Sequence, residues 1–82
     1  MRKSIHSAEQ ARLQKLLREV REGAGLRQME LAERLGKPQS FVSKYESGER
    51  RLDLIELHQV CRVVGISLVD FVGRFESLSP PS

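Results

Sequence analysis

The stretch from Gly25 to Arg51 contains a break between two short periodic segments, and this break limits what the chain can fold into. Before the break, three apolar residues share one face of a helix: Leu31, Ala32 and Leu35. Gly36 follows where a helix C-terminus favours a residue that adopts positive φ. Pro38 suits the first turn of a new helix, because its missing N–H would have no partner there. The sequence therefore predicts two short helices joined by a tight turn.

The second of these helices has two different faces. Val42 and Tyr45 lie three residues apart, so both can pack against the preceding helix. The polar side chains fall mainly on other faces and stay free for a partner: Gln39, Ser40, Ser43 and Lys44. Ala32 is small where two steeply crossing helices must approach closely. Gly48 is the expected positive-φ residue in the turn after the second helix.

A longer helix is predicted before this pair. Ser7 with Gln10 resembles a capping box that opens a helix over about residues 8 to 22. Its apolar stripe consists of Leu13, Leu16, Leu17 and Val20. Gly23–Gly25 ends this helix, and Leu26 can return to the core before the next helix begins near position 27 or 28.

Two more helices are predicted after the pair. Asp53 with Glu56 is a capping pattern, and Gly65 closes the helix that it opens. The apolar positions of this fourth helix are Leu54, Leu57, Val60, Cys61 and Val64. Ser67 with Asp70 opens a fifth helix in the same way. Its apolar stripe consists of Leu68, Phe71, Val72 and Phe75.

The length of 82 residues fits one domain with a small core. We expect a flexible arm over residues 1–6, an all-α, five-helix domain over residues 7–76 and a disordered tail over residues 77–82. The single cysteine excludes an intramolecular disulfide framework and favours a cytoplasmic protein. No apolar run approaches the length of a membrane span or a signal-peptide core, so we expect no membrane partner.

Charge is distributed unevenly along the chain. Residues 1 to 51 hold twelve Lys/Arg against seven Asp/Glu, a net charge of +5, whereas residues 52 to 82 hold two against four, a net charge of −2. The basic part contains the predicted helix pair. This asymmetry suits a protein whose N-terminal face approaches phosphates, although ordinary solvated helix surface is the alternative.

One motif links the helix pair to a known family. The chain from position 25 to 50 reads Gly-Leu-Arg-Gln-x-Glu-Leu-Ala-x-x-Leu-Gly-x-x-Gln-Ser-x-Val-Ser-x-Tyr-Glu-x-Gly-x-Arg. It resembles the helix-turn-helix of the phage Cro and repressor type, also called the xenobiotic-response-element (XRE) family, and the similarity covers roughly residues 13 to 75. This resemblance implies a lambda-repressor-like DNA-binding domain in a transcriptional regulator.

A helix in the major groove contacts bases mostly through its first turns, so Gln39 and Ser40 are the first candidates for base contact. Lys44 is the third, because lysine can donate to guanine. Ser43 is a candidate for base contact as well, with a phosphate contact or local packing as its alternatives. Phe41 either meets a thymine methyl or sugar, or covers the edge of the core.

Phosphate contacts position a protein of this kind on the duplex. The resemblance implies such a contact for Gln28, which opens the second helix. Four cations flank the reading helix and can reach the backbone: Arg27, Lys37, Arg50 and Arg51. Arg27 stands where the family usually has Ser, Thr or Asn, so capping of the second helix is expected to be weaker here.

The resemblance also implies a structural ion pair between Arg21 in the first helix and Glu46 at the end of the third. Such a pair would lock the orientation of the reading helix. If it is partly buried, loss of one partner would cost about 3 kcal/mol of stability. The alternative is an exposed pair worth less than about 1 kcal/mol.

One short helix that binds double-stranded DNA contacts only a few base pairs. We therefore expect a homodimer that binds a palindromic operator. The fifth helix is the expected interface, with Val69 and Phe75 as interface residues. Three further apolar residues of that helix have core packing as their alternative: Leu68, Phe71 and Val72.

No pattern indicates an enzyme, a metal site, a cofactor or a small-molecule ligand. His6 and His58 lack a second ligand at suitable spacing, and Cys61 lies on an apolar helix face. The alternative to a stand-alone regulator is a protein-interaction module, such as an antitoxin or developmental switch, that holds another protein through the fourth and fifth helices.

Overall fold

The helices begin where side chains cap their first turns. In the computed structural model, which describes residues 7–78, the Ser7 hydroxyl accepts from the Gln10 N–H at 3.0 Å and opens α1 (Ala8–Gly23). An Asp53 carboxylate oxygen accepts from the Glu56 N–H at 2.7 Å and opens α4 (Leu54–Val64). The Ser67 hydroxyl does the same for α5 (Leu68–Leu78). The three capping patterns in the sequence thus correspond to three helix starts.

The two shorter helices start differently. Before α2 (Gln28–Leu35), the Arg27 side chain caps no backbone group, and the Glu30 carboxylate accepts from the Arg27 N–H at 2.8 Å. Pro38 was expected inside the first turn of the next helix, but it stands one residue before α3 (Gln39–Ser47). Its ψ of 157° is extended rather than helical, so the helix begins only after it.

Two glycines end the central helices in the predicted way. Gly36 closes α2 with φ of +71°, and Gly48 closes α3 with φ of +90°. At Gly48 a Cβ atom would also lie 2.9 Å from the Gln14 side chain. The short turn at Gly36 joins α2 to α3, and these two helices pack against each other.

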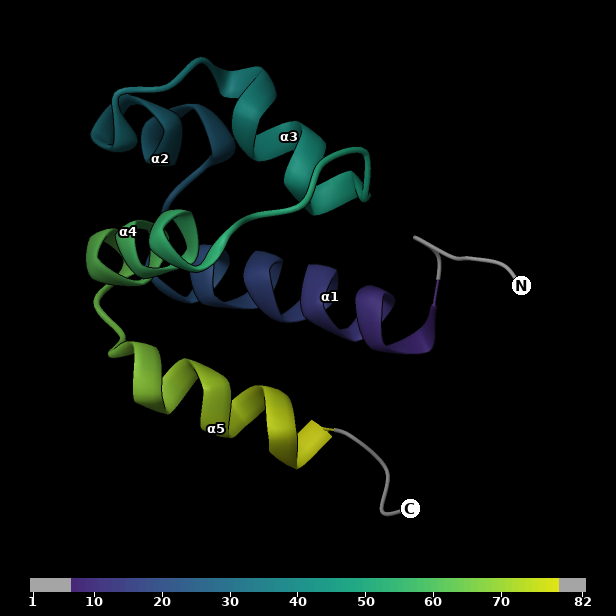
Figure 1. Ribbon diagram of the computed structural model, residues 1–82. Helices are drawn as coiled ribbons and strands as arrows, with labels where there is room; N and C mark the ends of the chain where they lie inside the picture. The colour runs from purple at the N-terminus through teal and green to yellow at the C-terminus, as the bar shows by residue number, and fades with distance from the viewer. Residues whose placement is uncertain (1–6, 79–82) are drawn as a thin grey trace.

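The helices form layers around one core, and Figure 1 shows α2 and α3 on one side, α1 and α4 in the middle, and α5 on the other side. α2 packs against α3 and α4, α1 against α3 and α5, and α4 against α5. The largest fully buried side chains come from α2, α3, α4 and α5: Leu31, Val42, Tyr45, Val60, Cys61 and Phe71. Among residues 7–78 the secondary structure is helix and loop, as expected for an all-α, five-helix fold.

Two apolar residues of the predicted helix stripes are exposed. Leu54 is 65% exposed, as is the neighbouring Ile55, so the first turn of α4 projects beyond the helices that cover the rest of its stripe. Val72 is 41% exposed because α5 places Phe71 at the centre of its buried face. α5 also continues to Leu78, two residues past the expected end of the domain. The expected arm and most of the expected tail, residues 1–6 and 79–82, lie outside the described residues.

We predict that Leu31→Ala lowers the free energy of unfolding by about 3 kcal/mol, because it opens a cavity at a fully buried site. Leu54→Ala is the matched control and should change that energy by less than about 0.5 kcal/mol, since Leu54 is exposed. Urea denaturation followed by circular dichroism measures both. Equal losses from the two variants would contradict the core described here.

Candidate nucleic-acid interface

α3 separates its side chains into a buried face and an exposed one. Val42 and Tyr45 are buried against the rest of the core. Gln39, Ser40 and Lys44 are exposed, and Ser43 is half-buried between the two faces. The start of α3 therefore presents two short polar side chains and, about one turn later, a cation to solvent.

Phe41 lies at the border of these faces. Its ring is half-buried against the core and meets the Tyr45 ring edge-on, with 5.6 Å between the centroids. Two cations lie near the same ring: Lys37 Nζ is 5.5 Å and Arg50 Cζ is 4.7 Å from its centroid. Phe41 thus covers the core edge, one of its two expected roles, and also packs with positive charge.

A buried ion pair joins α3 to α1. Arg21 Nε donates to Glu46 Oε2 at 2.7 Å, and Arg21 Nη2 donates to Glu46 Oε1 at 3.0 Å. Only 9% of Arg21 and 3% of Glu46 is exposed. Hydrogen bonding to Glu46 raises the pKa of Arg21 although burial opposes the charged form. The pair holds both charges in the core at the end of α3.

The same carboxylate also reaches the start of α2. Gln28 Nε2 donates to Glu46 Oε1 at 3.0 Å, and Arg21 Nη1 donates to the Leu26 carbonyl at 2.9 Å. Gln28 and Gln39 contribute to a surface hollow of about 450 Å³ between the starts of α2 and α3. Arg27 on the rim of this hollow is exposed. The Glu46 carboxylate therefore ties the end of α3 to the start of α2, one of the two helix starts that border this hollow.

The loop between α3 and α4 carries two adjacent arginines in different settings. Arg50 Nη2 donates to Glu56 Oε2 at 2.8 Å, and Arg50 Nη1 donates to Glu56 Oε1 at 3.1 Å. This pairing lowers the pKa of Glu56 to about 2. Arg51 is exposed, and its side chain has no hydrogen-bond or ion-pair partner within residues 7–78. Sequence patterns did not reveal the pairing of Arg50 with Glu56, because it crosses a loop at no regular spacing.

The residues expected at a dimer interface differ in exposure. Val69 is 81% exposed, whereas Phe75 is half-buried and packs against the core. Val69 and its neighbours line an apolar surface hollow of about 420 Å³, together with Leu68, Val72, Gly73 and Glu76. α5 therefore exposes an apolar face, and Figure 1 shows this helix on the opposite side of the molecule from α3.

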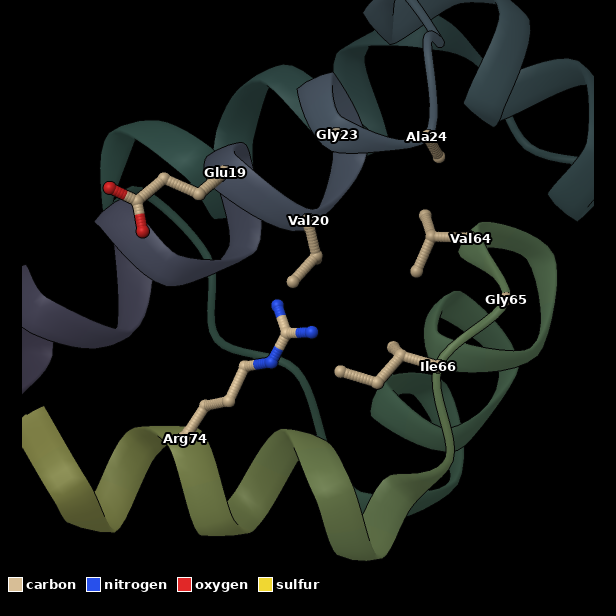
Figure 2. Close-up of a pocket in the computed structure, with 8 residues that line it drawn as sticks. All are labelled: Glu19, Val20, Gly23, Ala24, Val64, Gly65, Ile66 and Arg74. Atoms are coloured by element: carbon tan, nitrogen blue, oxygen red, sulfur yellow. The ribbon is translucent and has the colours of Figure 1, made fainter.

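Another hollow, of about 200 Å³, lies between the end of α1, the turn after α4, and α5. Figure 2 shows Arg74 extending from α5 into the space between Val20 and Ile66, whereas the Glu19 carboxylate points away. None of the residues predicted to contact DNA lines this hollow. It is thus separate from the face that α3 presents.

The remaining titratable candidates form no reactive cluster in the described part of the chain. Burial raises the pKa of the Cys61 thiol, and His58 is exposed. The Tyr45 hydroxyl is buried, and no group within residues 7–78 hydrogen bonds to it. Residues 7–78 contain no group of three or more side chains arranged to hold a metal ion and no helix long and apolar enough to cross a membrane. His6 lies outside the described residues.

The comparisons with known proteins agree with this geometry. A family profile described as helix-turn-helix matches residues 17–71. An XRE-family like protein from Pseudomonas syringae pv. tomato has 49% sequence identity, a TM-score of 0.82, and 93% of each chain covered. None of the curated proteins matches the chain significantly.

Two further solved structures share the fold. The clp gene regulator ClgR from Corynebacterium glutamicum has a TM-score of 0.76 and 25% identity, with 87% of this chain and 76% of that chain covered. The wild-type restriction-modification controller protein C.Esp1396I has a TM-score of 0.79 and 19% identity, with 88% of this chain and 95% of that chain covered.

These matches place the chain in the class of helix-turn-helix DNA-binding proteins. Within that class, the chain belongs to the Cro/C1-type, or XRE, family, and it is a DNA-binding transcriptional regulator.

We predict that Glu46→Gln lowers the free energy of unfolding by about 3 kcal/mol, because it leaves the buried Arg21 guanidinium without a counter-charge. Arg18→Gln is the control: Arg18 Nε lies 4.0 Å from Glu46 and its side chain is 58% exposed, so its loss should cost less than about 1 kcal/mol. Urea denaturation at pH 7 measures both. A Glu46→Gln variant with the same free energy of unfolding as the wild type would show that the ion pair does not stabilise the fold.

Proposed function

We propose that this regulator reads a palindromic operator by placing α3 in the major groove. The observation that supports this most is the division of α3, whose apolar face is buried while Gln39, Ser40 and Lys44 are exposed. A glutamine amide can pair with adenine through two hydrogen bonds, and lysine can donate to guanine. Ser43 is half-buried and borders this contact surface.

Phosphate contacts would fix the position of α3 on the duplex. Arg27 and Gln28 at the start of α2 would bind the backbone on one side of the groove, where the helix N-terminus adds backbone donors. Lys37 before α3 and Arg51 after it would serve the other contacts, whereas the Arg50 side chain, a further candidate from the sequence, is paired with Glu56. Gln28 can hold Glu46 with one amide hydrogen and still offer the second to a phosphate.

A second copy of the chain would supply the other half-site. Two-fold dimers read half-sites about 10 base pairs apart, which gives a longer and more specific target than one helix does. The apolar face of α5 supports this role, with Val69 at its centre and Phe75 at its border. Leu54 and Ile55 form another exposed apolar site that another protein could occupy.

Selection of bound duplexes from a random-sequence pool at near-physiological salt tests the proposal. The wild type should recover a palindrome with half-sites about 10 base pairs apart. The Gln39→Ala/Lys44→Ala variant should lose or relax that motif, because each good base contact is worth about tenfold or more in discrimination.

Gln59→Ala/Arg62→Ala is the matched control. It removes one glutamine and one cationic side chain from exposed positions of α4 and should leave the selected motif unchanged. Recovery of no motif by the wild type, with weak binding that disappears as salt rises, would contradict operator reading and favour a protein partner.

A further inference from the structure

The side chain of Arg50 is 39% exposed but contacts several protein groups, unlike that of its neighbour Arg51. Its two terminal nitrogens bind both oxygens of Glu56, and Nη1 also donates to the Arg51 carbonyl at 2.9 Å. Its guanidinium carbon lies 4.7 Å from the centre of the Phe41 ring. Arg50 therefore contacts α3, α4 and the loop between them.

Only arginine can make this set of contacts. The planar guanidinium binds a carboxylate through two parallel hydrogen bonds and covers an aromatic ring with its face, whereas a lysine ammonium is a compact charge. Glu56 neutralises the charge of Arg50 and also accepts from the Asp53 N–H at 2.9 Å. Arg50 thus has little free charge to attract a phosphate and few free donors to bind one.

We infer that Arg50 is a positioning residue for DNA binding: with Glu56 and Phe41 it fixes the loop that presents Arg51, and Arg51 makes the phosphate contact. The hydrogen bond to the Arg51 carbonyl holds the backbone from which the Arg51 side chain extends to solvent. The stack on Phe41 ties that loop to the first turn of α3, next to Ser40. This inference rests on the proposed operator binding and assigns different roles to two adjacent arginines.

The effect of Glu56→Gln on DNA affinity distinguishes positioning from direct contact. If Arg50 binds phosphate, removal of the nearby negative charge frees its guanidinium and strengthens binding to DNA. If Arg50 acts through its contacts, the same change loosens the loop and weakens binding to the operator. Glutamine can still accept from the Asp53 N–H, so the cap of α4 is kept.

Glu30→Gln is the matched control. Glu30 holds the same third position in α2 and accepts from the Arg27 N–H, but its ion pair with Arg27 is long, at 4.0 Å, and exposed. Its replacement also removes one negative charge from the side of the proposed interface. Operator affinity of this variant should stay equal or rise.

The experiment measures the affinity of each full-length variant for the selected operator and for a scrambled duplex over a range of salt concentrations. Glu56→Gln should weaken operator binding about tenfold, the size of one lost contact, and should weaken binding to the scrambled duplex as well, because a phosphate contact carries no sequence information. Arg51→Ala should lower the slope of log affinity against log salt by about one. Arg50→Lys should bind as weakly as Glu56→Gln, because the charge without the planar fork cannot restore the contacts.

Tighter operator binding by Glu56→Gln, or wild-type affinity in Arg50→Lys, would overturn the inference. Circular dichroism shows whether each variant is folded at the assay temperature. If Glu56→Gln is unfolded, the operator affinity of Arg50→Lys tests the inference in its place. Failure of the proposed operator binding can be told apart from failure of this inference, because the wild type itself would then bind the operator and the scrambled duplex equally.

Discussion

The ion pair between Arg21 and Glu46 is the interaction on which the rest of the structure depends. It joins the end of α1 to the end of α3, and both side chains are buried. Burial of two charges is costly unless hydrogen bonds satisfy the remaining donors and acceptors. Gln28 and the Leu26 carbonyl supply these bonds. Three helices are thereby fixed around one carboxylate, and the direction of α3 follows from it.

A second, more exposed ion pair extends this order to the loop after α3. Arg50 and Glu56 connect the loop to α4, and the contact between Arg50 and Phe41 connects it back to α3. Glu46 in the last turn of α3 belongs to the buried arginine–carboxylate pair, and Phe41 in its first turn contacts the arginine of the surface pair. The exposed side chains of this helix, Gln39, Ser40 and Lys44, can vary without disturbing either pair.

Local patterns in the sequence were enough to predict most of the fold. Ser7, Asp53 and Ser67 cap helices as expected, because N-cap chemistry depends on residues only three positions apart. Rotation of a helix relative to the core is a tertiary property, so the exposure of Leu54 was not predicted, and the sequence left Val72 open between the core and an interface. The contacts of Arg50 with Glu56 and Phe41 were not predicted for the same reason. The sequence showed Arg50 only as a cation that follows the helix expected to contact bases.

Titration of the isotopically labelled chain with a duplex that carries its selected operator, followed by backbone amide resonances in NMR spectra, tests the central claim most directly. The account predicts that the shifted and broadened amides cluster at residues 27–30, 37–44 and 50–52, the face ordered by the two ion pairs. Changes confined to α4 and α5, with residues 37–44 unaffected, would contradict the claim that α3 is the reading helix.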